Sequence, residues 1–207
     1  LEMQGQSTEA ERMLWALKTD FPTWPAARFA YARSLLASGD EESARNELQR
    51  VIELSPDHGP ALRARALLLA KAGVLSDAVA VAQQYYRTHP DSTDALGLLV
   101  DLARQTQQVS LAEQALDTAR ETFAQDPTRL LTVAEGYRAI GKGEAGREVL
   151  VAIAAVEPTN PAQVGSKARA LSALGQPVKA EQLLLERYEA SHAPVLAYEL
   201  GRAYLQS

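Results

Sequence analysis

Residues 59–92, GPALRARALLLAKAGVLSDAVAVAQQYYRTHPDS, decide the fold. Gly73 interrupts this Ala- and Leu-rich stretch near its middle, and Pro90 stands near its end. Glycine readily ends a helix because it adopts the left-handed conformation without a Cβ penalty. Proline stops a helix because it cannot continue the backbone hydrogen-bond ladder. The stretch therefore predicts two helices joined by a short turn.

The same pattern returns every 34 residues, and a fixed period of this length is typical of repeat architectures. The glycine position is occupied in turn by Gly39, Gly73, Gln107, Gly141 and Gly175. Two further positions favour small residues: Ala44, Ala78, Ala112, Gly146 and Ala180 stand in one, and Ala32, Ala66, Val100, Ala134 and Ala168 in the other, where Val100 departs from alanine. The proline position holds Pro56, Pro90, Ala124, Pro158 and His192.

Most remaining interior positions carry larger apolar residues, which fill the core between the small ones. They are Leu35, Leu69, Ala103, Tyr137 and Leu171 on the first helices, and Leu48, Ala82, Leu116, Leu150 and Leu184 on the second. Aromatic residues make up only 6% of the chain, and Ala and Leu are abundant. This composition favours closely packed helices. We therefore predict an all-α fold of about twelve helices.

A 34-residue helical hairpin with small residues at its eighth and twentieth positions and proline at its thirty-second resembles the tetratricopeptide-repeat (TPR) family. The resemblance implies an α-solenoid, a right-handed superhelix of antiparallel helix hairpins. It covers nearly the entire chain, so we predict a single array over residues 1–207. Full repeats are expected at 25–58, 59–92, 93–126, 127–160 and 161–193, after the second helix of a preceding repeat at 7–22 and before the first helix of a following repeat at 194–207.

Several positions depart from the pattern or add to it. Gln107 replaces the turn glycine of the third repeat, so we expect a longer or looser turn there. Gly146 either tightens a helix crossing or weakens its helix by about 1 kcal/mol. Asp126 and Asn160 each precede a proline and are expected to cap the helix that follows.

Both ends of the chain carry apolar residues where a solenoid normally has a polar capping helix. They are Met13, Leu14 and Trp15 at one end, and Leu196, Leu200 and Tyr204 at the other. We expect an internal segment of a longer array. The alternative is that these faces pair chains into homo-oligomers.

The family resemblance implies that the first helix of each repeat lines a concave groove that binds a protein or peptide partner. Six cations and three anions, Asp94 among them, give the corresponding positions a charge of +3, against −5 for the chain. Such a groove favours an acidic partner. Alternatively, Asp101 with Arg104 and Glu135 with Arg138 form solvated ion pairs along their helices. The predicted groove residues are Phe29, Arg33, Leu36, Arg63, Leu67, Lys71, Asp101, Arg104, Leu131, Glu135, Arg138 and Arg169.

No pattern in the sequence indicates catalysis, a cofactor or a metal. The chain has no cysteine, and His58, His89 and His192 stand in predicted turns. Residues 141–146, GKGEAG, lack the Lys-Ser/Thr that completes a P-loop and follow a predicted helix, so we expect a hairpin turn. The acidic net charge argues against nucleic-acid binding, and no apolar run is long enough to span a membrane.

We therefore predict a non-enzymatic scaffold for protein–protein interaction, bacterial in style because of its Ala, Leu and Gln content. One alternative, by analogy, is a periplasmic TPR region of exopolysaccharide export that binds an anionic polysaccharide or its modifying enzyme. Another is a structural spacer or self-assembling array. The localisation is unknown, since a cysteine-free chain suits both periplasm and cytoplasm.

Overall fold

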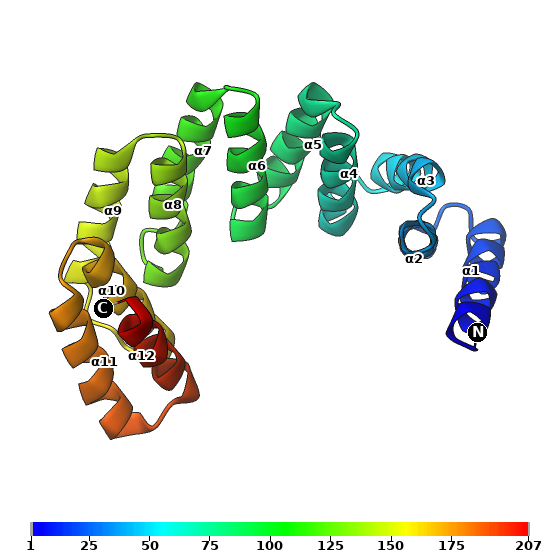
Figure 1. Ribbon diagram of the computed structural model, residues 1–207. Helices are drawn as coiled ribbons and strands as arrows, with labels where there is room; N and C mark the ends of the chain where they lie inside the picture. Colours follow the sequence, from blue (N-terminus) through cyan, green and yellow to red (C-terminus); the bar gives the residue numbers. More distant parts are fainter. Residues whose placement is uncertain (1, 207) are drawn as a thin grey trace. The chain divides into compact units, whose positions relative to one another are not determined.

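The computed structural model describes residues 2–206, which form twelve α-helices and no strand (Figure 1). This confirms the all-α prediction. The helices are α1 (Glu2–Asp20), α2 (Pro25–Ser38), α3 (Glu41–Leu54), α4 (Gly59–Lys71), α5 (Leu75–Thr88), α6 (Thr93–Gln105), α7 (Val109–Thr122), α8 (Pro127–Ala139), α9 (Gly143–Ala155), α10 (Pro161–Ala173), α11 (Pro177–Ser191) and α12 (Pro194–Gln206). They form two compact units, unit 1 up to Thr106 and unit 2 from Gln107. Their membership of one continuous array stays a prediction.

The turn glycines behave as the sequence predicts. Gly39, Gly73, Gly141 and Gly175 all have positive φ, between 76° and 87°. Gln107 takes the same left-handed conformation, with φ of 58°, although it has a Cβ. The turn between α6 and α7 is no longer than that between α4 and α5, so the expectation of a longer turn was wrong. Thr106 closes this end of α6, because its N–H and its hydroxyl both donate to the carbonyl oxygen of Leu102.

Proline and capping side chains separate the hairpins. Helices α3, α5 and α9 end just before Pro56, Pro90 and Pro158, as expected. The predicted caps are also confirmed. The Asp126 carboxylate accepts from the N–H of Thr128 at 3.0 Å, and the side-chain amide oxygen of Asn160 accepts from the N–H of Gln163 at 3.0 Å.

Unit 1 packs each helix against the next, and α4 also contacts α6. The small residues Ala32, Ala44, Ala66 and Ala78 are fully buried at these crossings. Sequence reasoning missed a network of charges between α1, α2 and α3. The largely buried Glu47 carboxylate pairs with Lys18 and lies 2.8 Å from the guanidinium of Arg28.

Unit 2 has the same plan, with the first helices α8, α10 and α12 in contact. Leu196 and Leu200 pack with Leu184 and other residues of α10 and α11, and only 1% and 6% of their surfaces are exposed. The expectation that these leucines belong to an exposed apolar end was therefore wrong. Leu196 and Leu200 are four residues apart, so they lie on the same face of α12, and that face packs against α10 and α11. Tyr204 is exposed, as expected, and so is Tyr198. Met13 and Trp15 of unit 1 are exposed, as expected.

Gly146 lies where α8 and α9 cross. A Cβ placed on it would be 2.9 Å from the carbonyl oxygen of Ala134 and 3.4 Å from Cβ of Tyr137. Backbone cannot move aside as a flexible side chain can. Of the two interpretations of this glycine, the structure therefore supports the tight crossing.

We predict that Gly146→Ala destabilises the protein by about 1 kcal/mol, because overpacking of roughly 1–3 kcal/mol exceeds the gain in helix propensity. Gly97→Ala, in the middle of α6, is the matched control, since nothing lies within 4 Å of its Cβ position. That variant should be stabilised by up to about 1 kcal/mol. Urea unfolding followed by circular dichroism measures both. A stabilised Gly146→Ala would contradict the tight crossing.

Candidate partner-binding surface

In unit 1, the predicted groove residues lie on the first helices of the hairpins, α2, α4 and α6. Phe29 and Leu36 are half-buried, and the Phe29 ring lies against the ring of His58 with their centroids 4.8 Å apart. Leu67 is 42% exposed, so an apolar side chain stands open to solvent on α4. The charged residues of this set are all exposed: Arg33, Arg63, Lys71, Asp101 and Arg104.

Ion pairs join neighbouring helices of unit 1. Arg63 Nε lies 2.9 Å from the Asp94 carboxylate on α6, and Lys71 pairs with Glu41 on α3. Among the residues described, Arg33 and Arg104 form no ion pair. Two cations of the set are therefore neutralised locally, and two remain available to a partner.

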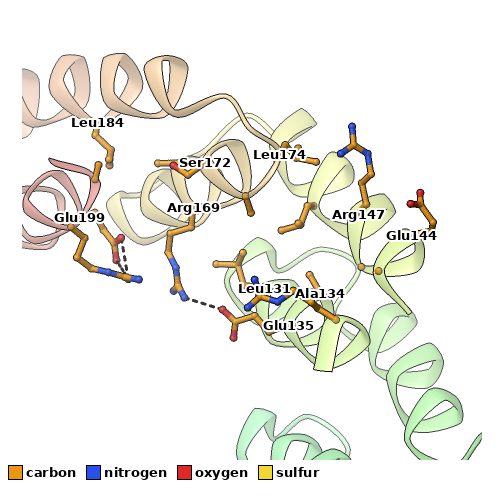
Figure 2. A pocket seen from close by; sticks show the side chains of 18 residues that line it. Leu131, Ala134, Glu135, Glu144, Arg147, Arg169, Ser172, Leu174, Leu184 and Glu199 are labelled. Atoms are coloured by element: carbon orange, nitrogen blue, oxygen red, sulfur yellow. Dashed lines mark hydrogen bonds and ion pairs between the residues drawn. The ribbon is translucent and has the colours of Figure 1, made fainter. Parts of the chain in front are cut away.

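In unit 2, four of the predicted residues line one cavity of about 610 Å³ between α8, α9, α10, α11 and α12 (Figure 2). This volume is within the usual range of ligand pockets. Leu131 is only 5% exposed, so it belongs to the cavity floor and does not stand out from the surface. The four residues are Leu131, Glu135, Arg138 and Arg169, and the other apolar side chains of the lining are Ala134, Leu150, Ala168, Ala173, Leu174, Leu184 and Ala203.

The rim of the cavity carries four arginines and three glutamates. Arg169 lies 3.2 Å from Glu135, and Arg202 lies 3.4 Å from Glu199 (Figure 2). Neither Arg138 nor Arg147 has an ion pair within the part of the chain that the structure describes. Sequence reasoning missed Arg147 because it lies on a second helix.

The two ion pairs expected along single helices, Asp101 with Arg104 and Glu135 with Arg138, are not formed. Over residues 2–206, Asp101 is not paired with Arg104, and Glu135 is paired with Arg169 instead of Arg138. Glu135 and Arg169 are 34 residues apart, which is one repeat. The repeat therefore brings equivalent positions of α8 and α10 together, and this contact replaces the pair along the helix.

The three histidines have structural roles at helix ends. The Nδ1 atom of His58 accepts from the N–H of Ala61 at 3.2 Å and caps α4. The rings of His89 and His192 lie edge-on against Tyr85 and Tyr188. No cluster of three or more His, Cys, Asp or Glu suited to a metal ion occurs among the described residues. Within the same range, no helix has the length and apolar character needed to cross a membrane.

Tyr137 is a buried residue of α8 beside the crossing with α9. Its side chain is 1% exposed, and its hydroxyl donates to the carboxylate of Asp117 on α7. Burial raises the pKa of Tyr137 above its ordinary value of 10.0, and the hydrogen bond and charge of Asp117 raise it further. The folded protein therefore holds this phenol proton more tightly than the unfolded chain does.

Helix hairpins of similar length, most of which turn at an αL glycine and pack through small residues, define the chain as an α-helical repeat protein. Two family profiles described as tetratricopeptide repeat match it, one over residues 3–59 and 30–92 and the other over residues 69–134. These matches together span more than half of the chain. The chain therefore belongs to the TPR family, and its fold is an all-α TPR solenoid.

Solved structures share this fold at low sequence identity. PilF of Pseudomonas aeruginosa matches with a TM-score of 0.55 and 12% identity, over 99% of this chain and 92% of that one. YrrB, described as a TPR protein with an unusual peptide-binding site, has a TM-score of 0.51 and 14% identity, over 91% and 97%. MamA of Desulfovibrio magneticus RS-1 has a TM-score of 0.52 and 18% identity, over 72% and 84%. The search of curated proteins finds no match.

The raised pKa of Tyr137 gives a prediction about pH. The buried, hydrogen-bonded phenol of Tyr137 should contribute fully to stability below about pH 10, the pKa of tyrosine in the unfolded chain. This contribution should be lost as the pH rises from there toward the higher pKa of Tyr137 in the folded protein. The urea midpoint should therefore fall between about pH 8 and about pH 11, and fall less in Tyr137→Phe. Tyr198→Phe, at an exposed tyrosine, is the control and should keep the wild-type slope. If the urea midpoint of Tyr137→Phe fell as much with pH as that of the wild type, the stabilising role of the Tyr137 phenol would be contradicted.

Proposed function

We propose that this chain is a non-enzymatic scaffold that binds a protein or peptide partner through side chains on its first helices. These are α2, α4 and α6 in unit 1, and α8, α10 and α12 in unit 2. The observation that carries the proposal is the unit 2 cavity, in which four of the predicted residues combine an apolar floor with a charged rim. Interaction through such surfaces is the usual role of TPR proteins.

The charges of the first helices favour an acidic partner. Arg33, Arg104 and Arg138 are exposed and form no ion pair among the described residues, whereas Arg63, Lys71 and Arg169 are paired. Free guanidinium groups are strong donors to carboxylates, and their attraction to an acidic partner falls with rising salt. The exposed Leu67 adds an apolar contact of the kind that anchors a peptide.

An immobilised random-peptide array, probed with the whole chain, tests this function. We expect a subset of peptides to bind and to lose most of its signal when Arg33, Arg104 and Arg138 are all replaced by Glu. Arg87→Glu, at an exposed arginine on α5 outside the set, is the matched control and should leave binding unchanged. An array without signal, or a signal equal in all variants, would favour the structural spacer over the binding scaffold.

Self-association is a second candidate, favoured by exposed aromatic side chains on the first and last of the described helices. Trp15 on α1 is 53% exposed, and Tyr198 on α12 is 66% exposed. Large apolar side chains in such positions commonly form interfaces.

Light scattering over a concentration series tests self-association. We expect the average mass to rise with concentration, and to stay at the monomer value when Trp15 and Tyr198 are both replaced by Ser. A monomeric wild-type chain at every concentration would rule this candidate out.

A further inference from the structure

We propose that the unit 2 cavity binds an acidic peptide segment in which a leucine-like side chain is flanked by carboxylates. Arg138 and Arg147 are the cations that select this segment. The inference rests on the proposed function, because it requires that the first-helix surface binds a peptide. It names the chemistry of the ligand, and it adds a residue from a second helix to the site.

The cavity floor fits an aliphatic side chain. Leu131 on α8 and Leu184 on α11 are 5% and 2% exposed, so their contacts are already fixed in the folded chain. Leu150 on α9 and Leu174 in the turn after α10 complete the apolar lining. A leucine-like side chain that enters this space loses water-exposed surface, which stabilises the complex.

The rim supplies two free cations. Arg138 in the last turn of α8 and Arg147 on α9 belong to the two helices of one hairpin, and both line the cavity. Figure 2 shows Arg147 projecting from α9 and Arg169 reaching toward Glu135. A carboxylate can accept two parallel hydrogen bonds from one guanidinium group. The lining also holds Glu144, whose carboxylate has no ion pair among the described residues, so the four arginines and three glutamates of the lining leave a net charge of +1. Two free arginines beside an apolar floor therefore still favour acidic side chains next to an apolar one.

The lining favours a peptide over other polyanions. No aromatic ring is among the residues described around the cavity, although stacking on rings is a common way to hold sugars and nucleic-acid bases. The floor is made of leucine and alanine, which offers those ligands no matching surface. A sulfated polysaccharide would use only the two arginines.

Glu135 limits the positive charge of the site. Its carboxylate lies 3.2 Å from the guanidinium of Arg169, so the charge of one cation of the lining is neutralised. Without this carboxylate, Arg169 becomes a third free arginine in the cavity. Glu135→Gln should therefore strengthen binding of an acidic ligand, an effect that a merely disrupted fold would not produce.

The probe is a fluorescein-labelled peptide of repeated Asp-Asp-Leu units, titrated with the whole chain and followed by fluorescence anisotropy. We expect Arg138→Ala and Arg147→Ala each to weaken binding about three- to tenfold, and Glu135→Gln to strengthen it about threefold. Arg187→Ala, at an exposed arginine of α11 that does not line the cavity, is the matched control and should change nothing. Circular dichroism verifies the fold of each variant.

Three companion ligands complete the test. Lys in place of Asp should abolish binding, Ser in place of Leu should weaken it, and dextran sulfate should compete poorly. Equal binding of the Ser peptide, better binding of dextran sulfate, or affinities that ignore Arg138, Arg147 and Glu135 would each overturn the inference. If peptides of the random array still bind in that case, the proposed function stands. If no peptide of any kind binds, both fail.

Discussion

The close crossing of the two helices in a hairpin, seen in α2 with α3, α4 with α5, α8 with α9 and α10 with α11, is the constraint on which the rest of the structure depends. Each hairpin has one position at this crossing that accepts only a small residue. Alanine there is fully buried, as Ala44, Ala78 and Ala180 show, and glycine at 146 leaves no room for a Cβ. Because backbone fills the crossing, the long side chains of the first helices must point elsewhere. Those on the open side become the surface available to a partner.

The sequence predicts this scaffold well because its signals are local. The turn conformation of Gly73 and the caps at Asp126 and Asn160 depend on a few neighbouring residues. These features can therefore be predicted from one amino-acid sequence. Gln107 shows the limit, since its conformation follows from the repeat and not from its own preference. Leu196 and Leu200 could not be placed either, because burial depends on which neighbour α12 meets.

The candidate site is less predictable, since its charges depend on contacts between helices. Spacing along one helix suggests that Glu135 pairs with Arg138. The structure pairs it with Arg169 one repeat later, and that choice leaves Arg138 free. Such exposed pairs contribute little to stability, typically under about 1 kcal/mol. Their main effect is to decide which cations stay unpaired and can bind a partner. The sequence does not reveal these unpaired cations, because the pairs join different helices.

The packing of the hairpin and the shape of the cavity are linked through α9. Gly143 and Gly146 both line the cavity, and Gly146 also makes the tight crossing with α8. The absence of a Cβ at Gly146 lets the helices approach, and it also keeps that part of the cavity wall free of side chain. The same approach brings Arg138 and Arg147 to one rim from two different helices. Gly146 therefore serves the packing of α9 against α8, and α9 in turn adds Arg147 to a cavity whose other arginines all come from first helices.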